Sequence, residues 1–428
     1  GRAMSAAFRP KKSYSAYVLG ALLLAYILNF VDRQLLAIAA PEVKAELGLS
    51  DTQLGLLLGF AFALFYGVAG IPIARLADLS SRRTVVAAGL ALWSTMTVLC
   101  GMARSFPQLL FARFGVGVGE AAGTPPSHSL ISDYFPPERR ATALAIYSCG
   151  IYFGTGFGFA GGGYVLELFD WRTAFWVAGL AGLPVALLIR LTVREPPPGA
   201  SESAAPAEPL PFRAVCAALF GSRAFLALTA AGACQALLGY AMLSWGTTYL
   251  RRVFELSAGD VGVAFGLAAA ASGALGVVTG GALADRLAAR DTRWFAWLGA
   301  IVSLLAFPFA AAFALAGSFQ NALLAFALFY TLNNMYVSSL WTLVQNLARP
   351  RARATASAIQ LALLNIVGYG LGPLLVGVLN DLFAPAFGAE SIRISLLCVS
   401  AVGAASAIFF MLCARALPGE LPRRTGAQ

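Results

Sequence analysis

The chain has 428 residues, of which 59% are hydrophobic and only 12% are charged. A mean hydropathy of +0.75 is more than the core of a soluble domain needs, so the composition excludes a soluble globular protein and indicates one that spans a membrane several times. The formal net charge of +10 would by itself suggest a nucleic-acid partner, but the positions of the charges give a different explanation.

Apolar runs of about 20 residues predict twelve membrane-spanning helices. In the first half the expected spans are 17–40, 53–76, 84–103, 107–131, 141–166 and 172–190. In the second half they are 225–249, 259–284, 294–316, 320–347, 355–379 and 392–414. We therefore predict an all-α membrane protein of two pseudo-symmetric six-helix bundles, which cover residues 17–190 and 224–415.

The basic residues gather on one side of the predicted membrane. With the N-terminus inside, the tails 1–16 and 416–428, the linker 191–223 and the loops on that side hold 22 of the 30 Lys and Arg, the opposite loops hold six, and two lie within spans. This bias follows the positive-inside rule. It predicts cytoplasmic termini in a bacterial-type inner (plasma) membrane, with membrane lipids as secondary contacts and no nucleic-acid partner.

Two motifs recur at matching positions of the two halves. RATALAI at 140–146 returns as RATASAI at 353–359, just after the fourth and tenth spans, and the loop after the second span is echoed after the eighth. Two related halves indicate rocking around a central site at mid-membrane depth. The repeated loops predict a cytoplasmic gate of Asp78, Arg82, Arg83, Arg139, Arg140, Asp285, Arg286 and Arg353.

Four ionisable residues lie inside expected spans: Asp32 and Arg33 in the first, Arg113 and Glu120 in the fourth. Charges at such depth are costly and mark a functional site. Helical spacing places Arg113 and Glu120 on one face and turns Arg33 about 100° away from Asp32. Asp32 and Arg113 share a depth of about 10 Å, with Glu120 about 10 Å further inward, so we expect Asp32 to pair with Arg113.

An arginine between two carboxylates can pass its stabilisation from one to the other as the halves rock, which changes which acid holds a proton. We therefore assign proton coupling to Asp32, Glu120 and Arg113. The alternative is a permanent pair between Asp32 and Arg113, with Glu120 bonded to a neighbouring helix. For Arg33 we expect a structural role, in which its long side chain reaches a helix end or bonds backbone carbonyls.

These motifs resemble the major facilitator superfamily over nearly the whole chain. Asn29-Phe30-x-Asp32-Arg33 in the first span, with Gly117-x-Gly119-Glu120 in the fourth, is similar to the Spinster branch, whose animal members export sphingosine phosphate or lysolipids. The resemblance implies alternating access and an amphipathic or lysolipid-like substrate. Phe159 stands where family antiporters carry a proline, a departure that weakens the analogy with antiport.

Glycines on the fifth span and polar residues of the second half complete the predicted machinery. A glycine at every fourth position predicts a ridge on which another helix lies close; these glycines are Gly150, Gly154, Gly158 and Gly162. A cavity with charged and amphipathic walls suits a substrate with a charged head and an apolar body. The substrate-binding candidates are Arg113, Asn29, Phe30, Tyr240, Trp245, Tyr330, Asn333, Asn334, Gln360 and Tyr369, each of which could instead bond a neighbouring helix.

Other chemistries find no support in the sequence. It has no Gly-rich loop ending in Lys-Ser or Lys-Thr, as an ATP-driven pump would need, and the spacing around His128 provides no base and acid for a hydrolase. We expect no enzyme activity, no cofactor and no metal. We predict a monomeric, proton-coupled exporter of an amphipathic or lipid-like substrate, working by proton antiport. The alternatives are a symporter or uniporter of a small organic anion, and a non-transporting membrane sensor or lipid-binding protein.

Overall fold

The computed structural model describes residues 11–197, 212–348 and 352–420. Within these ranges every regular element is a helix. The chain divides into two compact units, one made of residues 1–205 with 255–270 and the other of residues 206–254 with 271–428. The boundary between residues 205 and 206 lies within the predicted linker. One later segment departs from this division. The first part of α12 (Ala258–Ala288) packs with the first unit, although it belongs to the second half of the sequence.

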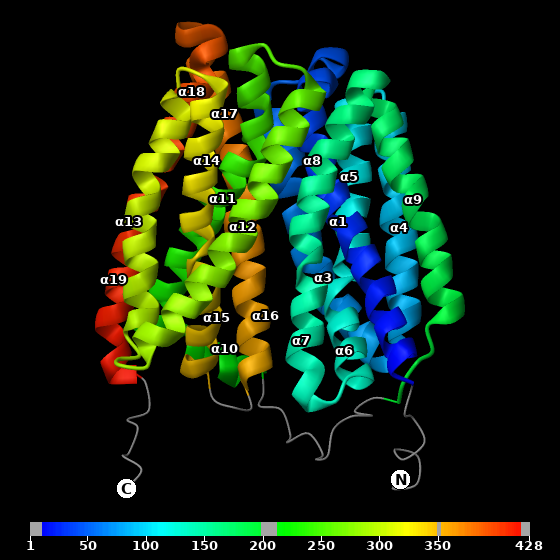
Figure 1. The fold of residues 1–428 in the computed structure, drawn as a ribbon, viewed down its shortest axis with the longest axis vertical. Coiled ribbons are helices and arrows are strands. Elements are labelled where there is room, and N and C mark those ends of the chain that lie inside the picture. Colours follow the sequence, from blue (N-terminus) through cyan, green and yellow to red (C-terminus); the bar gives the residue numbers. More distant parts are fainter. Residues whose placement is uncertain (1–10, 198–211, 349–351, 421–428) are drawn as a thin grey trace, which may run out of the picture. The chain divides into compact units, whose positions relative to one another are not determined.

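The first unit contains the six expected spans of the first half, whose helices run alongside one another in Figure 1. They are α1 (Lys12–Leu47), α2 (Asp51–Gly55) with the π-helix η1 (Leu56–Phe60) and α3 (Ala61–Leu79), α4 (Arg82–Met102), α5 (Phe106–Ala121), α6 (Thr124–Tyr134), α7 (Pro137–Ser148), α8 (Gly150–Leu168) and α9 (Trp171–Thr192). The expected span 107–131 is thus two helices. Pro125 and Pro126 lack the backbone N–H that a helix interior requires, so they open α6 and cannot continue α5.

Local sequence sets the sharp turn between α1 and α2. Gly48 ends α1 in the left-handed conformation, with φ of 64°, which glycine adopts without steric cost. Ser50 then begins α2 with a capping box, in which its side chain and that of Gln53 bond each other's backbone N–H. Lys44 Nζ lies 2.5 Å from Asp51 Oδ1 across the turn. The first two spans are therefore joined by a short, well-bonded connection.

The second unit repeats this organisation with the spans of the second half. Its helices are α10 (Phe212–Phe220), α11 (Arg223–Phe254), the rest of α12, α13 (Trp294–Leu315), α14 (Phe319–Asn334), α15 (Tyr336–Leu347), α16 (Arg353–Leu363), the π-helix η3 (Leu364–Gly370), α17 (Leu371–Phe387), the short 3₁₀ helix η4 (Gly388–Glu390), α18 (Ser391–Ser400) and α19 (Val402–Glu420). The last part of the predicted linker forms α10. Val215 and Leu219, four residues apart on one face of α10, are buried in the core of the second unit.

Ten segments of the described chain are long and apolar enough to cross a membrane. The longest, Thr355–Glu420, has 66 residues and contains both of the last two expected spans. The segment with α5 and α6 is not among the ten, because it is broken into helices of 16 and 11 residues that also carry Arg113, Glu120 and Asp133. The ten segments therefore agree with the twelve expected spans, because the longest segment holds two spans and the segment of α5 and α6 is the remaining one.

An arginine near the start of the sixth helical span of each half caps the third span of that half. In the first unit Arg172 Nη1 donates to the carbonyls of Gly101 (2.9 Å) and Ala103 (2.7 Å) at the end of α4. Its Nη2 lies 2.6 Å from Glu46 Oε1 of α1. A helix leaves its last carbonyls without partners, and a cation there also interacts favourably with the helix dipole.

The second unit has the equivalent arrangement around Arg393. Its Nη1 donates to the carbonyls of Ala314 (3.1 Å) and Ala316 (2.7 Å) at the end of α13 and lies 3.2 Å from the hydroxyl of Tyr249 of α11. We call these two sets the arginine clamps. Each joins the first, third and sixth spans of its half, so the internal repeat extends from sequence motifs to a three-dimensional contact.

Candidate functional site

A buried ion pair joins α1 to α5 in the first unit. Arg33 Nε lies 2.8 Å from Glu120 Oε2, and the two side chains are 10% and 0% exposed. Removing one member of such a pair leaves an uncompensated buried charge, which costs about 3 to 5 kcal/mol. The pair therefore holds the two helices together as long as Glu120 is ionised.

Asp32 and Arg113, the other two charges in this region, are each incompletely bonded. Thr97 Oγ1 of α4 lies 2.8 Å from Asp32 Oδ2, while Asp32 Oδ1 is buried with no hydrogen-bond partner among the described residues. Arg113 is 1% exposed, and in the same part of the chain its Nε and Nη1 also have no partner. Both guanidinium groups act electrostatically on both carboxylates. The four charges thus form one site with spare donors and acceptors.

Aromatic rings surround the guanidinium group of Arg33. Its carbon lies 4.7 Å from the ring centre of Phe30, 4.6 Å from that of Phe62 and 5.3 Å from that of Tyr66. The ring of Phe62 is also 5.7 Å from the guanidinium carbon of Arg113. Desolvated contacts of this kind contribute about 2 kcal/mol each. Arg33 therefore has stabilising partners that do not depend on the charge of Glu120.

The pairing differs from the one that helical spacing predicts. The structure joins Glu120 to Arg33 and brings Asp32 to Thr97, whereas we expected Asp32 to pair with Arg113 and Arg33 to reach a helix end. Spacing along a helix predicts only the direction of each Cα–Cβ bond. An arginine side chain is long and flexible, so Arg33 can reach Glu120 of α5 from a different face of α1 than the one that carries Asp32.

Glycines allow the helices around this site to approach closely. A Cβ at Gly117 of α5 would lie 2.8 Å from the carbonyl oxygen of Phe62, so the glycine lets α3 bring that ring to the arginines. The predicted ridge on α8 packs against α1. A Cβ at Gly154 would lie 2.6 Å from the carbonyl oxygen of Ile27, and one at Gly158 would lie 2.9 Å from that of Val31. Gly150 and Gly162 likewise face side chains of α1.

The substrate candidates of the second unit fall into two groups. Tyr240 and Tyr369 have ring centres 5.0 Å apart. Gln360 accepts a bond from Thr229 at 2.7 Å, and its buried Nε2 has no partner in the described chain. Asn333 is buried beside Gly239. Asn333 Oδ1 is also buried with no partner among the described residues, so Gln360 and Asn333 keep hydrogen-bonding capacity, as a ligand site requires.

Other candidates in this unit are occupied by contacts within the fold. Trp245 is fully buried and donates to the carbonyl of Pro373 at 2.9 Å, which packs α11 against α17. Asn334 donates to the carbonyl of Tyr330 at 2.7 Å, and the Tyr330 ring stacks on Phe326. For Trp245 the helix-to-helix alternative therefore describes the structure better than a ligand contact.

Sequence reasoning missed Gln235 of α11. It is fully buried, and in the described part of the chain its Nε2 and Oε1 both have no partner. The signal that could have revealed it is an amide side chain inside the expected span 225–249. In the structure Gly239 faces Asn333, and a Cβ at Gly232 would lie 3.6 Å from Gln360 Nε2. Residues three and four apart on a helix share a face, so Gln235 belongs with these amides.

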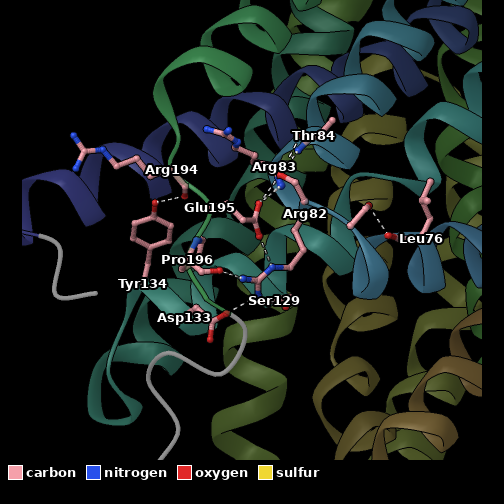
Figure 2. A network of polar contacts seen from close by, with 12 residues as sticks. Leu76, Arg82, Arg83, Thr84, Ser129, Asp133, Tyr134, Arg194, Glu195 and Pro196 are labelled. Atoms are coloured by element: carbon pink, nitrogen blue, oxygen red, sulfur yellow. Dashed lines mark hydrogen bonds and ion pairs between the residues drawn. The ribbon is translucent and has the colours of Figure 1, made fainter. Parts of the chain in front are cut away.

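Arg82, one of the predicted gate residues, is the centre of a polar network at the end of the first unit where α4 begins (Figure 2). Its Nη1 lies 2.5 Å from Asp133 Oδ2 and 2.8 Å from Ser129 Oγ, both on α6. Its Nε donates to Glu195 Oε1 at 2.8 Å, and its Nη2 donates to the carbonyl of Pro196 at 2.8 Å. Arg82 therefore fastens α6 and the segment after α9 to α4. Glu195 was not among the predicted gate residues.

The same segment is held at two further points (Figure 2). The backbone N–H of Arg83 donates to Glu195 Oε2 at 2.9 Å. The Nη1 of Arg83 donates to the carbonyl of Val193 at 2.8 Å. The hydroxyl of Tyr134 donates to the carbonyl of Arg194 at 2.6 Å. The first residues of the predicted linker, 191–197, are thus bound to the first unit.

The remaining predicted gate residues lie near the ends of α3, α7, α12 and α16. Asp285 and Arg286 are exposed on α12, and Arg139 is exposed on α7. Arg140 lies on α7 beside it, and Arg353 Nε donates to the carbonyl of Gln345 at 3.2 Å, near the end of α15. The side chain of Asp78 lies outside the described residues, so its predicted latch stays a prediction.

Comparison with known proteins identifies the family. A family model described as Major Facilitator Superfamily matches residues 22–373. The chain belongs to this superfamily. An MFS-type efflux pump of Mycolicibacterium smegmatis is 36% identical over 407 residues, which are 94% of this chain and 93% of that protein. Human protein spinster homolog 1 is 27% identical over 93% of this chain and 80% of its own length.

A solved structure agrees with this placement. A bacterial homologue of the human lysosomal transporter Spinster, in an inward-facing and unoccupied conformation, superposes with a TM-score of 0.88 at 30% identity, covering 97% of this chain and 100% of that one. The chain is therefore a multi-pass, Spinster-like transporter of the superfamily. Its residues Asp32, Arg33, Gly117 and Glu120, which carried the resemblance in the sequence, lie together in the first unit.

Proposed function

We propose that this transporter couples export of an amphipathic substrate to proton uptake, by antiport and as a monomer. The observation that most supports this is the buried ion pair of Arg33 and Glu120 beside a second carboxylate and a second arginine. Ionisable groups inside a membrane protein are retained for function more often than for packing. In a site with two acids and two arginines, one carboxylate can take up a proton without a large change in structure.

Proton binding would change the charge of this site and its bonding together. When Asp32 and Glu120 are ionised, the two acids and the two arginines sum to zero. A proton on Glu120 breaks the ion pair and gives the site a net charge of +1, while Arg33 remains among Phe30, Phe62 and Tyr66. Because like charges repel, a cationic or zwitterionic head would bind best before the proton and leave after it. Such mutual exclusion is what antiport requires.

The chemistry of the substrate follows from both units taken separately. The first unit provides charges and aromatic rings, and the second provides amides and the tyrosine pair Tyr240 and Tyr369. The charges and rings of the first unit suit a charged head beside apolar groups, and the Spinster relatives agree with a lipid-like molecule. The efflux pump among the relatives supports the outward direction.

A second candidate function is symport or uniport of a small organic anion. It rests on Arg113, whose buried Nε and Nη1 have no partner in the described chain. Two guanidinium donors of this kind match a carboxylate or phosphate. An anion would bind together with the proton, because the negative charge of the anion compensates the positive charge that the proton gives the site. The sign of the effect of protons on substrate binding therefore separates the two functions.

The test is proton-driven flux in proteoliposomes. We expect a step in pH to drive the release of a lipophilic cation or sphingoid base by the wild type, with counterflow of protons. Glu120→Gln should abolish the response to the pH step and leave substrate binding measurable. Glu138→Gln is the matched control, because Glu138 is an exposed acid on α7. A Glu120→Gln variant that still responds would show that Glu120 is not the coupling acid.

We also propose that both termini face the cytoplasm of a bacterial-type cell, with the protein in the inner membrane. The charge bias of the loops is the support for this orientation. A reporter that is active only in the cytoplasm, fused after Gln428, should be active. The same reporter inserted after Arg104, in the loop between α4 and α5, should be silent.

A further inference from the structure

A cavity of about 440 Å³ lies at one end of the first unit, apart from the charges of the candidate transport site. It is formed by the end of α1, the connection from α4 to α5 and the first turns of α9. The residues that matter for its chemistry are Glu46, Gly101, Met102, Arg104, Arg172 and Trp176. The volume is in the range of small-molecule sites. The charge bias places this end of the unit at the non-cytoplasmic surface of the membrane.

The charges of this cavity leave one cation uncompensated. Arg172 and Glu46 neutralise each other through a contact of 2.6 Å, and the guanidinium group of Arg172 also serves two carbonyls in the first arginine clamp. Arg104 is exposed, and no carboxylate pairs with it among the described residues. Asp170, two residues before Arg172, caps α9 by accepting from the N–H of Thr173 at 2.6 Å. Within the described part of the chain, the cavity therefore carries one unpaired positive charge, that of Arg104.

Met102 and Trp176 give the cavity an apolar part. Trp176 lies against Gly101, where a Cβ would come within 2.7 Å of the indole ring. Met102 and Trp176 are partly exposed, and exposed apolar side chains continue along both helices away from the cavity. On α4 these are Leu99 and Leu92, and on α9 they are Leu180 and Leu187. Tryptophan with a nearby arginine is typical of the level of lipid headgroups.

We propose that this cavity binds the headgroup phosphate of one anionic phospholipid, with the acyl chains along α4 and α9. Arg104 would meet the phosphate, Trp176 and Met102 would contact the glycerol region, and the exposed leucines would meet the chains. The uncompensated charge favours an anionic lipid over a zwitterionic one by about fivefold per arginine near the surface. This site is independent of the proposed proton coupling, because it shares no residue with it.

The experiment uses the full-length protein in nanodiscs of phosphatidylcholine with a minor fraction of phosphatidylglycerol. After extraction, native mass spectrometry counts the lipids that stay bound. We expect one retained phosphatidylglycerol in the wild type and a loss of about fivefold in Arg104→Gln. Arg190→Gln is the matched control, because Arg190 is an exposed arginine near the opposite end of the same helix α9. It should retain the lipid.

Several outcomes would overturn the assignment. Equal retention by Arg104→Gln and the wild type, or equal loss in Arg190→Gln, would remove Arg104 from the site. Equal retention of phosphatidylcholine would mean that charge is not recognised. Displacement of the lipid by millimolar inorganic phosphate would show that the cavity takes a free anion. A Trp176→Leu variant gives a second measurement on the apolar side, and we expect it to weaken retention without removing the preference for phosphatidylglycerol.

Discussion

Neutralising either member of the Arg33–Glu120 pair should destabilise the protein, and neutralising both should restore much of the loss. In Arg33→Leu the 0% exposed carboxylate of Glu120 loses its partner, at a cost of about 3 to 5 kcal/mol. In Glu120→Leu the guanidinium group of Arg33 keeps its aromatic contacts, which contribute about 2 kcal/mol each. We therefore expect Glu120→Leu to be the milder change. The double variant removes both charges and should recover about 3 kcal/mol.

Thermal unfolding of the four purified proteins measures this coupling. For a unit of 150 to 250 residues, the size of the first unit, about 1 kcal/mol shifts its Tm by roughly 2 to 4 °C. A recovery of about 3 kcal/mol should therefore raise this Tm by about 6 to 12 °C. A second cycle on Asp32→Asn and Arg113→Leu should give a smaller coupling, because the structure bonds Asp32 to Thr97. Additive effects at Arg33 and Glu120, within about 0.5 kcal/mol, would refute the pairing. Proton-driven flux should stay lost in both double variants.

Three further outcomes test the fold. Gly158→Ala should destabilise by about 1 to 3 kcal/mol through overpacking on α1, whereas Gly161→Ala, where no atom lies within 4 Å of the new Cβ, should not destabilise; equal effects would contradict the ridge. Arg82→Gln should lower Tm more than the exposed Arg139→Gln, since it leaves buried Asp133 unpaired, and the reverse order would exclude the network. The backbone N–H bond in the first turn of α9 lowers the pKa of Asp170 below its usual 3.8. The ionised Asp170 cap should stabilise the fold by about 1 kcal/mol above about pH 5, and this stabilisation should disappear as the pH falls through the lowered pKa. In acid titrations of Tm, Asp170→Asn should lack this dependence.

The fold could be predicted from the sequence because the features that determine it can be read along the chain without knowledge of tertiary contacts. Apolar length and charge bias define the spans, and the repeated motifs define the two halves. The exceptions have local causes. Pro125 and Pro126 divide the fourth span, and the amphipathic residues of α10 form a helix in a segment that the prolines and small residues around it indicated as a linker.

The pairing of the charges could not be predicted in the same way. Spacing along a helix gives the face on which Arg33 begins, but the position of its guanidinium group depends on which rings of α1 and α3 are close enough to hold it. That is decided by helix packing, here by Gly117 against Phe62. The network of Arg82 could be predicted only in part. Arg82 was among the predicted gate residues, whereas its partner Glu195, which lies 113 residues later in the sequence, was not.

The arginine clamps determine where each unit can bend. Arg172 and Arg393 bind backbone carbonyls, so the three spans that each clamp joins cannot separate at that end without leaving those carbonyls unbonded. We therefore expect the helices of each unit to move least against one another near the clamp and most at the opposite end. In the first unit, the charge-dependent bonds of Arg82 lie at that opposite end and oppose this movement.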